Sequence, residues 1–317
     1  MSGDAGKVVA LAGGVGAARM LTGLVQAIAP EEVVAIVNTG DDRVFYDVHV
    51  SPDLDIVTYT LGGVVQQSMG FGLEADSFQI VERLAKLGHE VWFRLGDRDY
   101  ANCLHRTLRM RAGAGLAEVV DELRRGYGIA TRILPMSEDP CPTLVELTDG
   151  VTVHFEEYLV RDGAPDDVKG VDLSAAAAAR PGPGVLEALR DAHTIVVCPS
   201  NPVVSIGPIL ALPGVREAIA ESAAPVVGVS PIVGNAPVKG PADRLLRGTG
   251  VEVSAHGVAG LYRDLLQGIL IDARDEAQCA DIEKLGLRCR AVDTMMVDRD
   301  VSKRLANDLL ELAETLR

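Results

Sequence analysis

Residues 7–19, KVVALAGGVGAAR, decide the fold, because an apolar run leads into a glycine-rich turn and then into helix-forming residues. This order of strand, turn and helix is typical of the first unit of a nucleotide-binding α/β sheet. Gly13, Gly14 and Gly16 allow the backbone to approach an anion at a helix start, and Arg19 can add positive charge. A tight turn that binds nothing is the alternative.

The turn departs from the pattern that binds NAD. When the pattern is read from Gly14 and Gly16, its third glycine position holds Arg19, whereas a glycine there normally lets the helix pack on the strand. The next apolar run, VVAIV, ends in Asn38, where a ribose-binding carboxylate would be expected. The motif GK[ST] of a P-loop does not occur. An NAD(P)-dependent oxidoreductase is therefore disfavoured.

Apolar runs of strand length recur along the 317 residues, at 8–12, 33–37, 194–198 and 226–229. Each is followed by a turn and a helical pattern, which predicts right-handed βαβ units. Hydrophobic residues make up 48% of the chain and aromatic residues only 4%, which favours helices packed closely on a parallel sheet. We predict an α/β fold, a Rossmann-like three-layer parallel sheet.

Residues 52–135 interrupt this alternation with mainly helical patterns. After them, TLVELTDGVTVHFEEYLV holds two β-rich runs around Asp149 and Gly150, which predicts a β-hairpin. The predicted division is a Rossmann-like nucleotide-binding core of residues 1–63 and 166–317, and an insert of helices plus hairpin of residues 64–165.

The formal net charge of −15 argues against a surface for nucleic acid or membrane, so neither is an expected partner. No apolar stretch approaches the roughly 20 residues of a membrane span, and the N-terminal segment lacks the features of a secretion signal. The five cysteines form no CxxC pair, and we expect reduced thiols in a cytoplasmic protein.

Four aspartates follow the second apolar run: Asp41 and Asp42 in NTGDD, and Asp53 and Asp55 in SPDLD. Ligands of parallel sheets bind beyond the carboxyl ends of the strands. If both segments converge there, their carboxylates suit Mg²⁺ beside substrate phosphates. Ser51 as N-cap and acidic residues in a first helical turn are the simpler interpretation of SPDLD. That interpretation gives Asp41 and Asp42 no structural role.

Two further segments carry candidate ligand-binding residues. RLGDRD contains Arg94 and Asp97, which could hold a planar or anionic group or form solvated surface. PSNPVVSIGP follows the third apolar run and could point hydroxyl and N–H groups at a diphosphate, or could simply cap a helix. Its candidate residues are Ser200, Asn201, Ser205 and Gly207. A later loop, SPIVGNAPVKGPA, is expected to face the same crevice with Lys239.

Seven strings, in this order, resemble the 2-phospho-L-lactate transferases of coenzyme F-420 biosynthesis, including bacterial members that use phosphoenolpyruvate. They are GGVGAAR, NTGDD, SPDLDIVTYTLGG, RLGDRD, ILPMSEDP, PSNPVVSIGPIL and SPIVGNAPVKGPA. The resemblance implies that a guanosine-diphospho three-carbon acid (phospholactate, phosphoenolpyruvate or phosphoglycerate) donates its phospho-acid group. The acceptor is the ribityl hydroxyl of the deazaflavin FO, 7,8-didemethyl-8-hydroxy-5-deazariboflavin, and GMP leaves.

The resemblance also implies roles for particular residues. Asp55 and Arg94 match positions that contact the deazaflavin, with the insert covering that site, and Asp41 matches an acidic position near Mg²⁺ and the reacting phosphate. The glycine turn and the loop at 200–207 match the nucleotide side, and relatives suggest a homodimer. We expect Asp41 and Asp55 to be catalytic, with Asp41 as the best candidate base for an alcohol nucleophile. Asp41, Asp42 and Asp53 are the predicted Mg²⁺ ligands.

A non-catalytic regulator of the same fold that binds a nucleotide sugar is the alternative function. Such a protein would have no need for SPDLD and RLGDRD.

Overall fold

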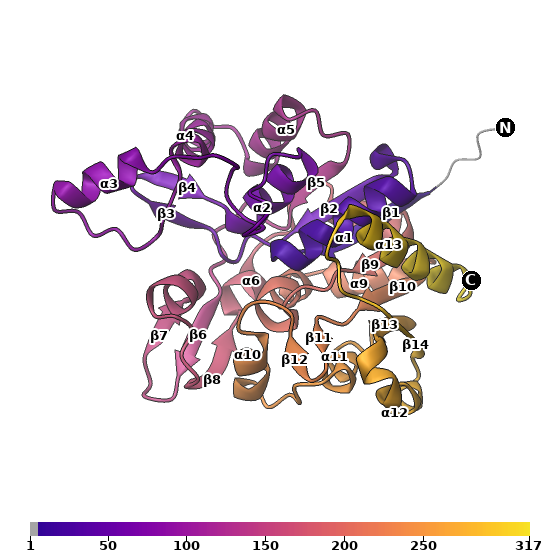
Figure 1. The fold of residues 1–317 in the computed structure, drawn as a ribbon. Coiled ribbons are helices and arrows are strands. Elements are labelled where there is room, and N and C mark those ends of the chain that lie inside the picture. Colours follow the sequence, from indigo (N-terminus) through magenta and orange to yellow (C-terminus); the bar gives the residue numbers. More distant parts are fainter. Residues whose placement is uncertain (1–5) are drawn as a thin grey trace.

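A computed structural model describes residues 6–317 of the protein. Residues 1–5 lie outside the described residues. The predicted core and the N-terminal segment both begin with these five residues. Within residues 6–317, seven parallel strands form the central sheet (Figure 1). In spatial order they are β5 (Arg132–Pro135), β2 (Val33–Val37), β1 (Lys7–Ala12), β9 (Ala192–Val197), β10 (Val226–Val229), β13 (Gly268–Asp272) and β14 (Arg288–Val292).

The order of the strands gives the sheet a topological switch point. The chain starts in the middle at β1, adds β2 and β5 on one side, and then adds β9, β10, β13 and β14 on the other. Val9 of β1 pairs with Val34 of β2 and with Ile195 of β9. This is the Rossmann arrangement, in which a crevice opens where the order reverses, here between β1 and β9.

Helices cover both faces of the sheet, so the fold has three layers (Figure 1). Val8 and Ala10 of β1 face one helical layer, and Val9 and Leu11 face the other. The first layer contains α1 (Gly14–Ala27), α2 (Pro52–Leu61), α5 (Leu116–Gly126) and α13 (Arg299–Glu314). The second contains α6 (Ser174–Ala178), α7 (Val185–Arg190), α8 (Gly207–Ala211), α9 (Val215–Glu221) and α11 (Ala255–Leu261). The predicted fold class is confirmed.

The insert adds helices and a small antiparallel sheet beside this core, and a further hairpin forms in the core segment after β2. Its helices are α3 (Gln79–Lys86), α4 (Asp97–Arg111) and α5. The hairpin around Gly150 forms from β6 (Leu144–Leu147) and β7 (Thr152–His154), and β8 (Val168–Asp172) extends it. A second hairpin, β3 (Arg43–Phe45) and β4 (Val48–Val50), was not predicted. β5 lies in the predicted insert but joins the main sheet, and β8 lies in the predicted core but pairs with β6 of the insert. The domain boundaries at 63 and 165 therefore stay a prediction.

Short elements connect these units. They are η1 (Pro30–Glu32), η2 (Glu157–Arg161), η3 (Pro202–Ile206), β11 (Ile232–Val233), β12 (Ala236–Pro237), α10 (Ala242–Gly248), η4 (Ala273–Gln278) and α12 (Cys279–Lys284). All five cysteines belong to the described residues and are free thiols there.

In residues 6–317 no single helix is long and apolar enough to cross a membrane, although η3 with α8, taken together with α9 at a bend of 80°, reaches that length and composition.

Candidate functional site

Three chain segments meet at the switch point, beyond the carboxyl ends of β1, β2 and β9. Gly16, in the first turn of α1, lies so close to the Pro199 carbonyl that a Cβ would collide with it. A Cβ on Gly13 would lie 2.6 Å from Asp53 Oδ2 and 2.7 Å from Ser205 Cβ. The glycine turn therefore serves close packing between β1, α2 and the loop after β9.

Replacing Gly16 by Ala should destabilise the fold. The new methyl group would strike backbone, which cannot move aside as a flexible side chain can, and overpacking of this kind costs about 1–3 kcal/mol. Gly260→Ala in α11 is the matched control, because no atom lies within 4 Å of its new Cβ among the described residues. We expect that control to be neutral or stabilising by up to about 1 kcal/mol. Urea denaturation measures both, and equal stability of the two variants would contradict this packing.

Asn38 connects the segments at the end of β2. Its side chain is fully buried, and Nδ2 donates to Asp53 Oδ2 at 3.0 Å and to the Val204 carbonyl at 3.3 Å. Its Oδ1 accepts a hydrogen bond from the Gly40 backbone at 2.8 Å. The Asn38 side-chain amide thus joins NTGDD, SPDLD and the loop after β9. Asn38 occupies the position at the end of the second strand where a dinucleotide-binding fold has a carboxylate.

Four acidic side chains gather around this amide, and we call Asp41, Asp42, Asp53 and Glu156 the acidic centre. Asp41, Asp53 and Glu156 are each only 4% exposed. None of these three forms an ion pair within residues 6–317. The structure thus buries three carboxyl groups together without a cationic side chain bonded to them.

Asp42 differs because it has partners. His49 Nε2 lies 3.0 Å from Asp42 Oδ2, and Ser51 Oγ donates to the same oxygen at 2.7 Å. Ser51 does precede α2, as predicted, but its hydroxyl bonds Asp42 instead of capping the helix. NTGDD and SPDLD therefore converge through two separate contacts, one between Asn38 and Asp53 and one between Asp42 and Ser51.

Several buried oxygens of this region have no hydrogen-bond partner in the described part of the chain. They are Oδ1 of Asp41, Oδ1 of Asp42, Oγ1 of Thr143 and Oγ of Ser200. A buried polar atom without a partner is destabilising, so such a group usually meets a ligand or ordered water. Carboxylate oxygens are the ligands that Mg²⁺ prefers, so Asp41, Asp42 and Asp53 have suitable donor atoms, and their binding of that ion stays a prediction. In residues 6–317 only Asp55, Asp99 and Cys103 place three possible ligand atoms within 4.8 Å of one another.

The pKa values of the acidic centre show how strongly burial opposes its negative charge. Burial, and then the charges of Asp53, Glu156 and Asp42, raise the pKa of Asp41 well above its usual value. Burial raises the pKa of Asp53 to about 6, although hydrogen bonds from Asn38 and Gly14 oppose the rise. Burial and the charges of Asp53 and Asp42 raise the pKa of Glu156 to about 8. A bound cation would relieve this repulsion.

The metal-free protein should lose stability as pH rises from about 5 to about 8. Folded-state pKa values of about 8 for Glu156 and about 6 for Asp53 lie above the unfolded values of 4.5 and 3.8. The folded state then binds more protons than the unfolded state, so deprotonation removes stability. Urea titrations in EDTA measure the slope, and Glu156→Gln should flatten it. Stability that rises across this range in the wild-type protein would contradict the arrangement.

Asp55 belongs to a different cluster. It lies two residues after Asp53 on α2, so its side chain leaves the helix on nearly the opposite side and meets Arg106 of α4. Arg106 Nη1 donates to Asp55 Oδ2 at 3.1 Å, and Nη2 donates to Oδ1. Ligand atoms of Asp55, Asp99 and Cys103 lie within 4.8 Å of one another, as a metal site would need. Arg106 already supplies a positive charge to this cluster, and a cation at the acidic centre stays the prediction.

Arg94 lies in the segment before α4, and Asp97 is the first residue of that helix. Asp97 accepts hydrogen bonds from Ser77 Oγ at 2.6 Å and from the backbones of Gln79 and Ile80 at 3.1 and 2.9 Å. It therefore caps the start of α3. Arg94 is exposed and lies over the Phe78 ring, 4.1 Å from its centroid. Contacts of either residue with a bound molecule stay a prediction, as does that of Asp55.

The loop after β9 combines capping with unpaired polar groups. Asn201 Oδ1 accepts from the backbones of Val203 and Val204 at 3.0 and 3.3 Å, so it caps η3. Ser200 is buried with its hydroxyl unpaired, Ser205 packs on the glycine turn, and Gly207 begins α8. Asn201 is thus a helix cap, as the simpler interpretation of this loop expected, whereas the unpaired hydroxyl of Ser200 could bind a ligand.

A loop of the insert lies over the glycine turn. A Cβ on Gly70 would come within 2.7 Å of a Val15 methyl group. Lys239 donates to the Met69 carbonyl, and its Nζ lies 5.0 Å from the centre of the exposed Phe71 ring. Arg19 donates to the Met296 carbonyl at 3.0 Å. Lys239 and the insert therefore meet beside the turn, on the side where a nucleotide is expected.

Three residues of these clusters were missed by the sequence analysis: Thr143, Glu156 and Arg106. Glu156 stands in FEEY, where nothing distinguishes it from its neighbour Glu157. Arg106 is one of four arginines of α4. Only the seven-residue spacing from Asp99 and the three-residue spacing from Cys103, which place all three near one helix face, could have suggested its partners.

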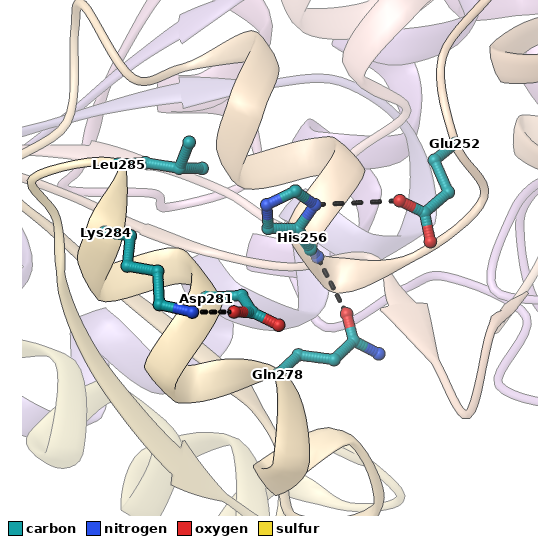
Figure 2. A pocket seen from close by; sticks show the side chains of 6 residues that line it. All are labelled: Glu252, His256, Gln278, Asp281, Lys284 and Leu285. Atoms are coloured by element: carbon teal, nitrogen blue, oxygen red, sulfur yellow. Dashed lines mark hydrogen bonds and ion pairs between the residues drawn. The ribbon is translucent and has the colours of Figure 1, made fainter.

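A separate pocket of about 510 Å³ lies between α11 and α12 and is lined by none of the predicted residues (Figure 2). Its charged groups are paired: His256 Nδ1 lies 3.6 Å from Glu252, and Lys284 Nζ lies 2.6 Å from Asp281 (Figure 2). These pairs satisfy each other, and the pocket does not enter the functional argument.

The chain has a Rossmann-like fold with a buried acidic centre at its switch point, an arrangement that suits the binding of a phosphorylated ligand together with a cation. Comparison with protein families specifies the class. The model described as "2-phospho-L-lactate transferase CofD" matches residues 8–310. The chain belongs to this family, so it is a CofD-type transferase of coenzyme F-420 biosynthesis, as its motifs predicted.

Individual relatives match over nearly their whole length. The chain is 47% identical to the phosphoenolpyruvate transferase of Streptomyces griseus, over 98% of this chain and 99% of the relative. It is 39% identical to the 2-phospho-L-lactate transferase of Methanosarcina mazei, over 96% and 99%. A solved structure from Bacillus halodurans, a member of the UPF0052 family, has a TM-score of 0.65 at 19% identity and covers 97% of this chain and 100% of its own. That likeness shows the fold alone.

Proposed function

We propose that this protein transfers a phospho-three-carbon-acid group from its guanosine diphosphate ester to the terminal ribityl hydroxyl of FO. The hydroxyl oxygen attacks the phosphorus that carries the acid, and the bond from this phosphorus to the bridging oxygen breaks. The bridging oxygen leaves on GMP, and the hydroxyl proton passes to a base. The product is a phosphodiester of the deazaflavin.

The observation that carries the proposal is the acidic centre at the switch point. Asp41 is buried there with Oδ1 unpaired among residues 6–317, and it follows β2 directly. Its unpaired oxygen can accept a proton inside the site. We therefore assign Asp41 the acceptance of the hydroxyl proton.

Asp41, Asp42 and Asp53 are the residues that would hold Mg²⁺. The ion would supply charge neutralisation on the phosphate oxygens. Asn38 keeps Asp53 turned toward the glycine turn through the 3.0 Å hydrogen bond, and His49 and Ser51 hold one oxygen of Asp42 while leaving the other free. This chain's part is thus to keep unpaired oxygens fixed where a cation is needed.

The insert and the second loop supply the acceptor side in this proposal. Arg94 is exposed and planar, Asp55 is held by Arg106, and the exposed Met69 and Phe71 offer apolar surface for a ring. Lys239 beside Phe71 can offset phosphate charge at the border between donor and acceptor.

Among the three possible donors, phosphoenolpyruvate is favoured. Relatives named phosphoenolpyruvate transferase are 45–47% identical to this chain in the Streptomyces griseus and Kitasatospora aureofaciens proteins, against 39% for the Methanosarcina mazei phospholactate transferase. We further expect a homodimer that works in the cytoplasm, where its free thiols stay reduced.

Incubation of the protein with FO, Mg²⁺ and each guanylylated acid in turn, followed by mass analysis, tests the proposal. The expected product is FO joined through phosphate to the acid, with one GMP released per product and the phosphoenolpyruvate ester used fastest. If none of the three esters is consumed while a UDP-sugar binds tightly, the regulator is the better description.

A further inference from the structure

Two of the five cysteines lie side by side at one edge of the central sheet. Cys279 begins α12, and Cys289 lies near the start of β14, the last strand of the sheet on that side (Figure 1). The Cys289 thiol donates to Cys279 Sγ at a sulfur–sulfur distance of 3.2 Å. Because bonded sulfur atoms lie about 2 Å apart, a shift of about 1 Å would bring the two thiols to bonding distance.

The other three cysteines have different surroundings. Cys103, Cys141 and Cys198 are each 3% exposed or less, whereas Cys279 and Cys289 are partly exposed. No other two cysteine thiols are in hydrogen-bonding contact in residues 6–317. The edge of the sheet is therefore the place where two thiols meet and where a small oxidant from solvent can reach them.

Regular elements hold both sulfur atoms in place. Cys289 pairs with Ile269 of β13 in the strand register, and Ile282 of α12 is fully buried against the core. Burial, and then the hydrogen bond and the charge of Cys279, raise the pKa of the Cys289 thiol. Cys289 thus keeps its proton, so the first attack on an oxidant is assigned to Cys279.

We propose that Cys279 and Cys289 are a redox-sensitive dithiol that hydrogen peroxide converts into an intramolecular disulfide. The Cys279 thiolate sulfur attacks one peroxide oxygen, the O–O bond breaks, and the second oxygen leaves as hydroxide, which takes up a proton to form water. The Cys289 sulfur then attacks the sulfenic sulfur of Cys279. The S–O bond breaks, the hydroxyl leaves with the Cys289 proton as a second water, and the S–S bond forms. The two electrons lost by the sulfur atoms end on the peroxide oxygens.

Gln278, the residue before Cys279, connects this pair to the loop that carries Lys239. Its Nε2 donates to Asn235 Oδ1 at 3.3 Å, and its Oε1 accepts from the His256 backbone at 2.8 Å (Figure 2). A disulfide at Cys279 therefore fixes the end of η4 at the point where it meets that loop. The oxidised protein gains a covalent link between α12 and β14 in a region that the proposed reaction does not use.

Peptide mapping of the full-length protein tests the bond itself. The folded protein is treated with hydrogen peroxide at about pH 8, where thiols begin to ionise, and the remaining thiols are then alkylated during unfolding. Trypsin cleaves after Lys284 and Arg288, so Cys279 and Cys289 fall on separate peptides that stay joined only through a disulfide. We expect joined peptides in most of the wild-type protein, and their release by dithiothreitol.

Thermal unfolding tests whether the bond fits the native structure. The oxidised wild-type protein should unfold about 3–6 °C above the reduced one, because a cross-link restricts the unfolded chain. Cys279→Ser and Cys289→Ser should show no such rise after peroxide treatment. Cys289→Ser should also accumulate a sulfenic acid at Cys279, which dimedone traps, because the second thiol is gone.

The proposal is overturned if both wild-type cysteines are recovered as alkylated thiols or as separate sulfinic acids. Joined peptides that come from two protein molecules, seen as a dimer on a non-reducing gel, overturn it as well. So does an oxidised protein with a lower Tm than the reduced one, because the bond would then form only by distorting this edge of the sheet. None of these results depends on whether the protein transfers a phospho-acid group.

Discussion

Asp41→Ala should abolish measurable transfer while leaving the protein folded. Loss of a positioned acid or base typically lowers a rate by about 10²–10⁴-fold, and Asp41 is also a predicted cation ligand, so we expect a loss at or beyond the upper end. Stability should not fall in the metal-free state, because the variant removes a carboxyl group that burial and three acidic neighbours disfavour in its charged form. Initial rates of GMP release, with thermal unfolding in EDTA, measure both effects.

Asp264→Ala is the control for removing an aspartate without touching the site. Its side chain is 85% exposed and lies 3.7 Å from Arg263, a weak surface pair. This variant should keep wild-type rate and stability. Transfer by Asp41→Ala at a rate near that of the control would remove Asp41 from the mechanism, and an unfolded Asp41→Ala protein would make the residue a structural one.

Arg106→Met should be the most destabilising of these substitutions, by about 3–5 kcal/mol, because it leaves the Asp55 carboxylate buried without its partner. The Arg106 side chain is 1% exposed and that of Asp55 7%. Burial lowers the pKa of Arg106, and the charge of Asp55 more than reverses this, so the guanidinium stays charged. Asp99 adds a further acid, whose pKa burial and Asp55 raise to about 7. Urea denaturation gives the difference in the free energy of unfolding.

Arg109→Met, one turn further along α4, is the matched control. Arg109 pairs with Glu118 and Glu122 at the surface, where solvent screening leaves such pairs little effect on stability. In the double variant Asp55→Leu/Arg106→Met both charges are gone, and much of the lost stability should return. If Arg106→Met and Arg109→Met cost the same, the buried pair does not link α2 to α4 as described.

The sheet could be predicted because its pattern is local. Val8 to Ala12 and Val33 to Val37 are buried on both faces, so each reads as a continuous apolar run, and Gly13 to Gly16 mark the turn that follows. The position of Asp41 at a strand end then placed it at the crevice, because parallel strands end at one edge. NTGDD and SPDLD converge as expected, through Asn38 and Asp53 and through Asp42 and Ser51.

What could not be predicted depends on contacts between distant segments. The hairpin of β3 and β4 turns at Tyr46 and Asp47 with positive φ values of 50° and 65°, without the glycine that usually signals such a turn. Glu156 becomes buried only because the β7-β6-β8 sheet docks on the turn after β2. In the same way, the separation of Asp53 from Asp55 follows from helical geometry on α2 and from Arg106, which the motif SPDLD does not reveal.

Anomalous diffraction from crystals soaked with Mn²⁺ and GDP tests the central claim most directly, because it locates the cation among the two acidic clusters. We expect one Mn²⁺ peak within bonding distance of Asp41 and Asp53, with the diphosphate beside it at the carboxyl ends of β1 and β9. A peak instead at Asp55, Asp99 and Cys103, or a nucleotide bound with the acidic centre left open to water alone, would contradict it.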